Sequence, residues 1–117
     1  MAIIRGKIGN IATLPTTVGA IYTNAASTRT FFKGVTLFNS GEAAETVRLY
    51  NVPNSGGSVG TAAATNQFLE IGLASKETFI FEFPGDGAVH ENTNETIQGF
   101  TTTANTVTYQ LHGVKDV

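Results

Sequence analysis

The sequence predicts an all-β fold, a single β-sandwich of about eight short strands with jelly-roll or immunoglobulin-like topology. The first observation is a series of short runs in which apolar and polar residues alternate, as in half-buried strands. The second is the gathering of Gly, Pro, Asn and Ser between these runs, which predicts turns. The third is composition: charged residues are 14% of the chain, against about 25% in typical domains. Amphipathic helices need more charge on their outer faces.

Residues 28–53 carry the clearest strand signals. Residues 30–39 and 45–52 alternate between apolar and polar side chains, and a short polar break at 40–42 separates them. Two such runs joined by a short Ser/Gly break predict a β-hairpin, to which the other strands add. The side chains expected to face the core are Val35, Leu37, Val47 and Leu49.

The first 18 residues differ in pattern from the rest of the chain. Ile4 and Ile8 stand around the charged Arg5 and Lys7, a pattern typical of a short edge strand or of an arm. We therefore divide the chain into an N-terminal arm or edge segment, residues 1–18, and a β-sandwich domain, residues 19–117.

The remaining strands are predicted from the same alternation. Residues 54–67 hold small polar residues and no strong apolar anchor, which predicts a long flexible loop with a short helical turn near 62–64. At 78–83, three phenylalanines alternate with other residues, so we expect them in the middle of the core. The other strands are expected at 19–23, 68–73, 88–91, 95–101 (with a candidate bulge at Gly99) and 106–114, before a tail at 115–117.

Composition and charge exclude several classes of function. The net charge is −2 and no basic cluster occurs, which argues against nucleic-acid binding. No apolar run approaches the roughly 20 residues of a membrane span, and we expect no membrane partner. The N-terminus lacks the apolar core of a secretory leader, so synthesis in a cytoplasm is expected. The absence of cysteine excludes disulfides and thiolate chemistry.

No catalytic motif, cofactor motif or metal-ligand spacing is present, so we expect neither an enzyme nor a metal site. His90 and His112 lack partners at ligand spacing and are interpreted as surface histidines. Asp86, Glu91 and Glu95 lie in a turn-rich region without the acidic spacing of a calcium loop. Three tyrosines offer a sugar-stacking alternative, although packing within strands explains them more simply: Tyr22, Tyr50 and Tyr109.

The order of features over residues 19–114 resembles a known family. It is carried by AIYTNAASTRTFFKGVTLFNSGEAAETVRLYNVPNSGGSVGT, then by FLEIGLASKETFIFEF, and then by ENTNETIQGFTTTANTVTYQLHGV, above all its closing TANTVTYQLHGV. This layout resembles the small β-sandwich structural proteins of tailed bacteriophage virions, which include capsid decoration (cement) proteins and head, neck or tail fibre modules. The resemblance implies a non-enzymatic protein on the outer surface of the phage head, as a homotrimer bound to the major capsid protein.

A short domain without a fibrous stalk favours decoration within that family. The alternative is a tail or neck adhesion module that binds host-surface glycan through Tyr or Asn side chains. Deleting residues 1–10 is expected to lower capsid occupancy without unfolding the domain. The expected capsid contacts lie in the N-terminal segment and in the 54–66 loop: Ile3, Ile4, Arg5, Lys7, Ile8, Ser55, Val59 and Thr61.

Overall fold

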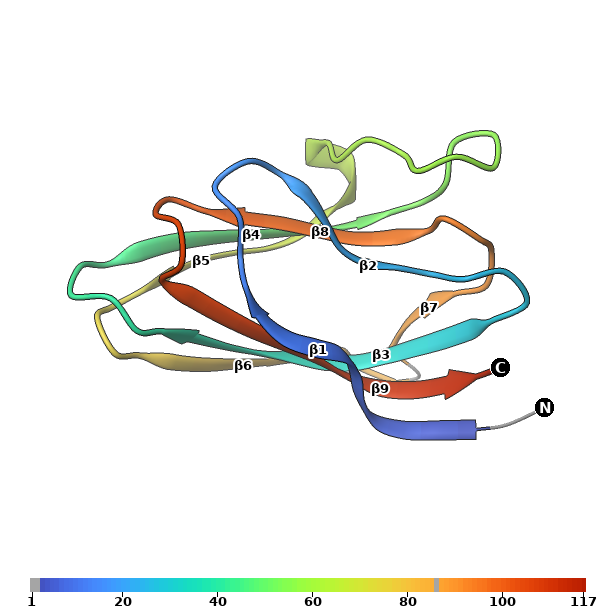
Figure 1. Cartoon of the computed structure of the whole chain (residues 1–117), viewed down its shortest axis with the longest axis horizontal. Helices are drawn as coiled ribbons and strands as arrows, with labels where there is room; N and C mark the ends of the chain where they lie inside the picture. The colour runs from blue at the N-terminus through green and yellow to red at the C-terminus, as the bar shows by residue number, and fades with distance from the viewer. Residues whose placement is uncertain (1–2, 86) are drawn as a thin grey trace.

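The computed structural model describes residues 3–85 and 87–117 and shows two antiparallel sheets packed face to face (Figure 1). Its elements are β1 (Ile3–Thr13), β2 (Gly19–Thr23), β3 (Arg29–Asn39), β4 (Glu45–Val52), the short 3-10 helix η1 (Ala64–Asn66), β5 (Gln67–Leu73), β6 (Thr78–Glu82), β7 (Ala88–His90), β8 (Thr96–Thr101) and β9 (Val107–Asp116). Sheet A has the order β1–β9–β3–β6, with β7 also paired to β3, and sheet B has the order β2–β8–β4–β5. The predicted β-sandwich is confirmed. No helix in the described part is long and apolar enough to cross a membrane.

The strand pairs are nested in the sequence. β4 pairs with β5 at the centre, β3 pairs with β6 and β7, β2 pairs with β8, and β1 pairs with β9, all antiparallel. One long antiparallel ribbon that rolls up produces this order, because successive pairs then fall alternately in sheet B and sheet A. Of the two predicted topologies, the structure has the jelly roll.

The predicted hairpin between β3 and β4 is wrong, although both strands form where expected. β3 lies in sheet A and β4 lies in sheet B, so residues 40–44 cross from one layer to the other. Both strands turn their apolar rows toward the same core, and facing strands in two layers satisfy this as well as neighbours in one sheet. Alternation alone therefore does not distinguish a hairpin from a crossing.

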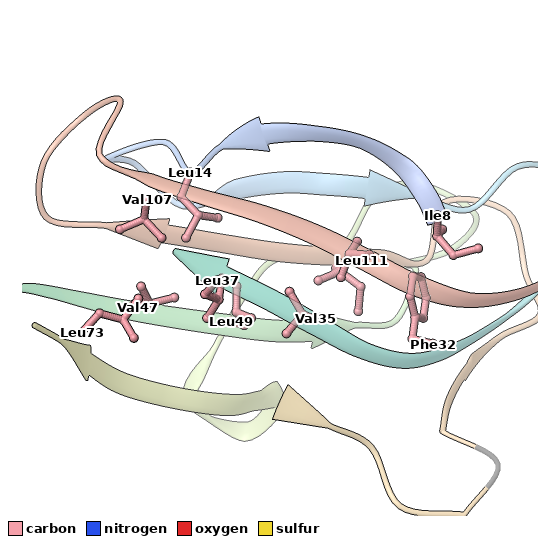
Figure 2. Packing of buried hydrophobic residues seen from close by; sticks show 11 residues of the cluster. Ile8, Leu14, Phe32, Val35, Leu37, Val47, Leu49, Leu73, Val107 and Leu111 are labelled. Atoms are coloured by element: carbon pink, nitrogen blue, oxygen red, sulfur yellow. The ribbon is translucent and has the colours of Figure 1, made fainter. Parts of the chain in front are cut away.

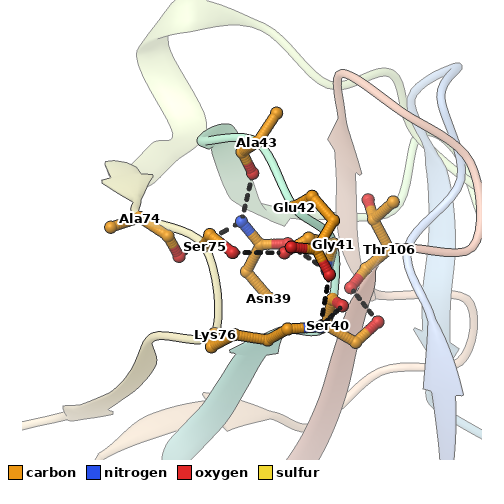
Figure 3. A network of polar contacts seen from close by, with 9 residues as sticks. All are labelled: Asn39, Ser40, Gly41, Glu42, Ala43, Ala74, Ser75, Lys76 and Thr106. Atoms are coloured by element: carbon orange, nitrogen blue, oxygen red, sulfur yellow. Dashed lines mark hydrogen bonds and ion pairs between the residues drawn. The ribbon is translucent and has the colours of Figure 1, made fainter.

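The buried side chain of Asn39 organises the crossing (Figure 3). Its Nδ2 donates to the carbonyl of Ala43 at 2.8 Å and to the carbonyls of Leu73 and Ala74 at 3.2 Å each. Its Oδ1 accepts a hydrogen bond from the Gly41 N–H at 2.9 Å. One amide thus joins the β3–β4 crossing to the end of β5, where the chain crosses back to β6.

The core lies between the sheets and is built from strand side chains of both layers (Figure 2). The four inward residues predicted in β3 and β4 are confirmed, with no exposed surface. Of the adjacent phenylalanines, Phe32 enters the core fully and Phe31 is half-buried on the other face. The main cluster comprises Ile8, Leu14, Phe32, Val35, Leu37, Val47, Leu49, Leu73, Ile97, Val107 and Leu111.

The three phenylalanines near β6 do not occupy the middle of the core. They are only partly buried, because β6 is an outer strand of sheet A. Phe81 and Phe83 instead gather with Phe68 of β5, with ring centroids 5.0–5.7 Å apart. This aromatic cluster closes one side of the sandwich, where the outer strands of both sheets meet.

The described part of residues 1–18 forms an edge strand rather than a free arm. β1 pairs along β9, and a register shift between Ile8 and Ala12 interrupts the ladder. Ile8 and Leu14 are buried in the core cluster. Deleting residues 1–10 would therefore remove a core side chain and a ladder, and we now expect this deletion to destabilise the domain.

Two smaller expectations also differ from the structure. The chain at 115–116 belongs to β9 and is not a tail. Gly99 pairs in regular register with Leu49, and the irregularity lies instead in β2, between Ala20 and Tyr22. A side chain at Gly99 would meet the Leu49 methyl Cδ2 at 2.5 Å, so close packing explains the glycine.

Candidate assembly surfaces

The open edge of β1 is the first candidate surface. β1 pairs only with β9 among the described strands, so its other side presents unpaired N–H and C=O groups that can accept a further strand. The side chains of Ile3 and Ile4 are 60% and 47% exposed. Arg5 and Lys7, which follow them in the sequence before the buried Ile8, are also exposed. Ile8 is 2% exposed and leaves the proposed contact set.

The 53–66 connection is the second candidate surface, and the structure places it on the sheet B layer, away from β1 (Figure 1). Ser55, Val59 and Thr61 are exposed there. The sequence predicts a flexible loop, but three side-chain amides tie this connection to neighbouring backbone. Asn54 donates to Thr93 O at 2.9 Å, Asn94 to Gly57 O at 2.8 Å, and Gln98 to Gly60 O at 3.0 Å. The short helical turn forms two residues later than expected, as η1.

The opposite edge of sheet A, at β6, is a surface that the sequence analysis did not select. Ile80 is 57% exposed and Glu82 is exposed beside it, while the partly buried rings of the aromatic cluster lie on the other face of the strand. Strand alternation does predict which residues point outward here. It does not predict that β6 is an outer strand, because that depends on the order of strands in the sheet.

A pocket of about 250 Å³ lies near the start of β3 and the end of β9. Its lining includes Arg29 and Glu91, which form an ion pair at 3.2 Å. No histidine lines it, and in the described ranges no three acidic or histidine side chains converge on a metal-sized site. The pocket therefore offers no nucleophile–histidine pair. Its lining is Ser27, Thr28, Arg29, Glu91, Asp116 and Val117.

The acidic turn and the tyrosines have structural partners. Glu95 Oε1 accepts the backbone N–H groups of Glu91 and Asn92, both at 2.7 Å, which closes the turn; Asp86 lies outside the described residues. Tyr50 stacks on Phe100 and is 8% exposed. Tyr22 meets Phe32 edge to face, and the Tyr109 hydroxyl donates to the Ile21 carbonyl at 3.4 Å; burial raises the pKa of Tyr109. Packing within the fold thus accounts for each tyrosine.

His90 is buried, so its expected surface position is wrong. It is 1% exposed, and its ring meets Phe32 edge to face at 4.9 Å. Its Nε2 lies 2.6 Å from Asn51 Oδ1, a contact that joins β7 in sheet A to β4 in sheet B. An amide oxygen accepts, so Nε2 carries the proton in this contact. Burial lowers the pKa of His90, which favours the neutral ring. His112 remains half-buried on β9.

Stability is expected to fall as the pH drops below about 6.5, because burial lowers the pKa of His90 below its ordinary value. The unfolded chain then binds a proton that the folded chain resists, and the slope for one such group is at most about 1.4 kcal/mol per pH unit. Above pH 6.5 the ring is neutral in both the folded and the unfolded chain, so this group no longer makes stability depend on pH. Urea unfolding across pH 5 to 8 measures this dependence, with His90→Gln as the comparison. An equally steep fall for His90→Gln would assign the effect to other groups.

Comparisons with known proteins found no matching family model and no curated protein with significant similarity.

Proposed function

We propose that this chain is a non-enzymatic structural protein of a tailed-phage particle, and specifically a capsid decoration protein. One observation carries the proposal: two exposed surfaces suited to protein contact lie on different layers of one rigid sandwich. They are the β1 edge, with Ile3, Ile4, Arg5 and Lys7, and the sheet B loop, with Ser55, Val59 and Thr61. A cement protein must hold at least two neighbours at once, and two separated surfaces permit this.

The fold and the resemblance add support. The jelly roll is common in viral capsid domains, although a fold alone supports many functions. The sequence pattern over residues 19–114 resembles small virion proteins of tailed phages. Most charged side chains of the sheet B layer are already used within the chain, for example Arg48 with Glu70 at 2.6 Å. The loop surface around Val59 is therefore largely uncharged and suits contact with a protein shell.

Stabilisation would follow from mass action. A protein that binds the assembled shell of the major capsid protein, and not its free subunits, shifts the equilibrium toward the shell. Each bound copy adds buried area between subunits that otherwise resist internal pressure only through their own contacts. This mechanism uses no cofactor, no metal and no catalytic residue of the chain.

Immunogold labelling of intact particles tests the location. Label spread over the phage head is the expected result. Label confined to the neck or tail would favour adhesion instead, and no label from an antibody that binds the native protein would contradict an exposed virion role.

Val59→Asp is expected to lower occupancy of undecorated shells by about tenfold or more, because a charge would then be buried against the shell. Val59 is 48% exposed, so the substitution leaves the core intact. Occupancy is measured by cosedimentation with shells at equal protein concentration.

Val18→Asp is the matched control, since Val18 is 42% exposed in the β1–β2 connection. Equal occupancy for Val59→Asp and the wild type would remove the loop from the contact.

A further inference from the structure

We propose that the β1 edge of one copy pairs with the β6 edge of a second copy, so that sheet A continues from subunit to subunit. The inference rests on the proposed assembly function and names the partner of one of its two surfaces. The sheet B loop then remains free for the shell.

The direction of the strands permits this contact. Sheet A is antiparallel throughout, and its order β1–β9–β3–β6 places β1 and β6 at opposite edges. Along this four-strand path the directions alternate, so β1 and β6 run in opposite directions. A second copy placed beside the first in the same orientation would therefore bring β6 antiparallel to β1, which continues the hydrogen-bonding pattern of the sheet.

The lengths of the two edges also agree. β1 pairs with β9 in regular register from Ile3 to Ile8, and the register then shifts near Gly9, whose φ is +78°. The part of β1 that keeps one register with β9 is thus residues 3–8, with Gly6 at φ +106° inside it. Its length is close to that of β6, residues 78–82. Two short edges of similar length can pair without leaving a long unpaired overhang.

Charge selects β6 over a second β1 as the partner. Arg5 and Lys7 are exposed on β1 and are in no ion pair within the described residues. The β6 edge carries Glu82, and Glu77 comes directly before the strand; neither is in an ion pair within those residues. Contact of β1 with β6 brings cations to carboxylates, whereas contact of β1 with another β1 brings cations together.

Apolar surface at the two edges adds to the contact. Ile80, 57% exposed, stands on the outer face of β6, and Ile3 and Ile4 stand on β1. Partly buried Phe81 lies on the other face of β6 with the aromatic cluster. A strand laid along β6 would cover Ile80 and part of this cluster, and apolar area removed from water stabilises association.

The contact uses a different surface on each partner, so it is heterologous and forms either a closed ring or an open chain of copies. A trimer, the oligomer that the phage resemblance implies, is one closed ring of this kind. Sedimentation equilibrium of the full chain over a range of concentrations measures the association. We expect wild-type oligomers and about tenfold weaker association for both Arg5→Glu and Glu82→Lys, because antiparallel pairing of residues 3–8 with 78–82 places position 5 next to position 82, and each substitution puts like charges there.

Mixing the two variants gives the decisive result. In a mixture, Arg5 of one variant lies next to Glu82 of the other, and the two substituted positions also carry opposite charges, so association is expected to return. Thr65→Glu is the control for an added negative charge: Thr65 is exposed in η1, outside both edges of sheet A, and the substitution should leave association within about twofold of the wild type.

Three outcomes would overturn the inference: a wild-type monomer at every concentration reached, normal association of Glu82→Lys alone, or no recovery in the mixture. These failures differ from failure of the proposed function. A monomer that still binds shells overturns only the β1–β6 contact, and an oligomer that binds no shells overturns only the decoration role. Circular dichroism of each variant establishes that it is folded.

Discussion

Phe32→Ala is expected to lower the free energy of unfolding by about 3–5 kcal/mol, the usual cost of removing a buried phenylalanine. Phe32 has no exposed surface, and its ring meets Tyr22 edge to face at 5.2 Å and His90 at 4.9 Å. The substitution removes contacts between β3, β2 and β7 and leaves a cavity in rigid surroundings. A domain of this kind is stable by only about 5–15 kcal/mol, so the loss is a large share.

Phe31→Ala is the matched control for this prediction, since the two rings are adjacent in β3 and point to opposite faces. Phe31 is half-buried, so its removal should cost clearly less. Urea unfolding followed by circular dichroism measures both variants. Equal losses, or a greater loss for Phe31→Ala, would contradict the assignment of Phe32 to the core.

Asn39→Asp is expected to destabilise the fold by about 3 kcal/mol or more, because the new carboxylate oxygen replaces an N–H donor that faces three carbonyl oxygens. The shape of the side chain is preserved, so the effect isolates hydrogen bonding from packing. Asn39→Ala removes the same bonds without the added charge and is expected to cost somewhat less, about 2–3 kcal/mol.

The pH dependence of Asn39→Asp distinguishes this mechanism. Carbonyl oxygens around the introduced carboxyl raise its pKa, so the folded variant binds a proton more readily than its unfolded chain. The destabilisation should therefore shrink as the pH falls, since a protonated carboxyl can donate again. Asn10→Asp makes the same change at an exposed position of β1 and should have little effect. A pH-independent loss for Asn39→Asp would contradict the role of the donor.

The strands themselves could be predicted from the sequence because each strand signal is local. Alternation placed Val35, Leu37, Val47 and Leu49 inward, and all four have no exposed surface. The same alternation does not identify neighbours. A polar break of a few residues connects two strands in one sheet or in two, and the buried Asn39 amide, with acceptors 34 and 35 residues away, is what joins the two crossings here.

For the candidate surfaces, too, some residues could be selected from the sequence and others only from the structure. Arg5 and Lys7 were selected from sequence because charge interrupts apolar residues there, and both are exposed. Ile8, chosen by the same pattern, faces the core because β1 pairs beside β9 in sheet A and strand alternation turns Ile8 toward the space between the sheets. Ile80 and Glu82 were not selected, since nothing local marks β6 as an outer strand. His90 was expected at the surface because it has no partner at metal-ligand spacing, yet β7 turns it toward Phe32 and Asn51.

By itself, the sequence determined the all-β class, the position of most strands, the inward rows of β3 and β4, and the absence of cysteine chemistry. These depend on side-chain chemistry and on the two-residue period of a strand, which act over a few residues. Only the tertiary structure decided the jelly-roll order, the two sheet crossings at Asn39, the burial of Ile8 and His90, and the opposite charges of the β1 and β6 edges. These features depend on which strands become neighbours. The neighbours are determined by the free energy gained when segments far apart in the chain bury their side chains in one shared core.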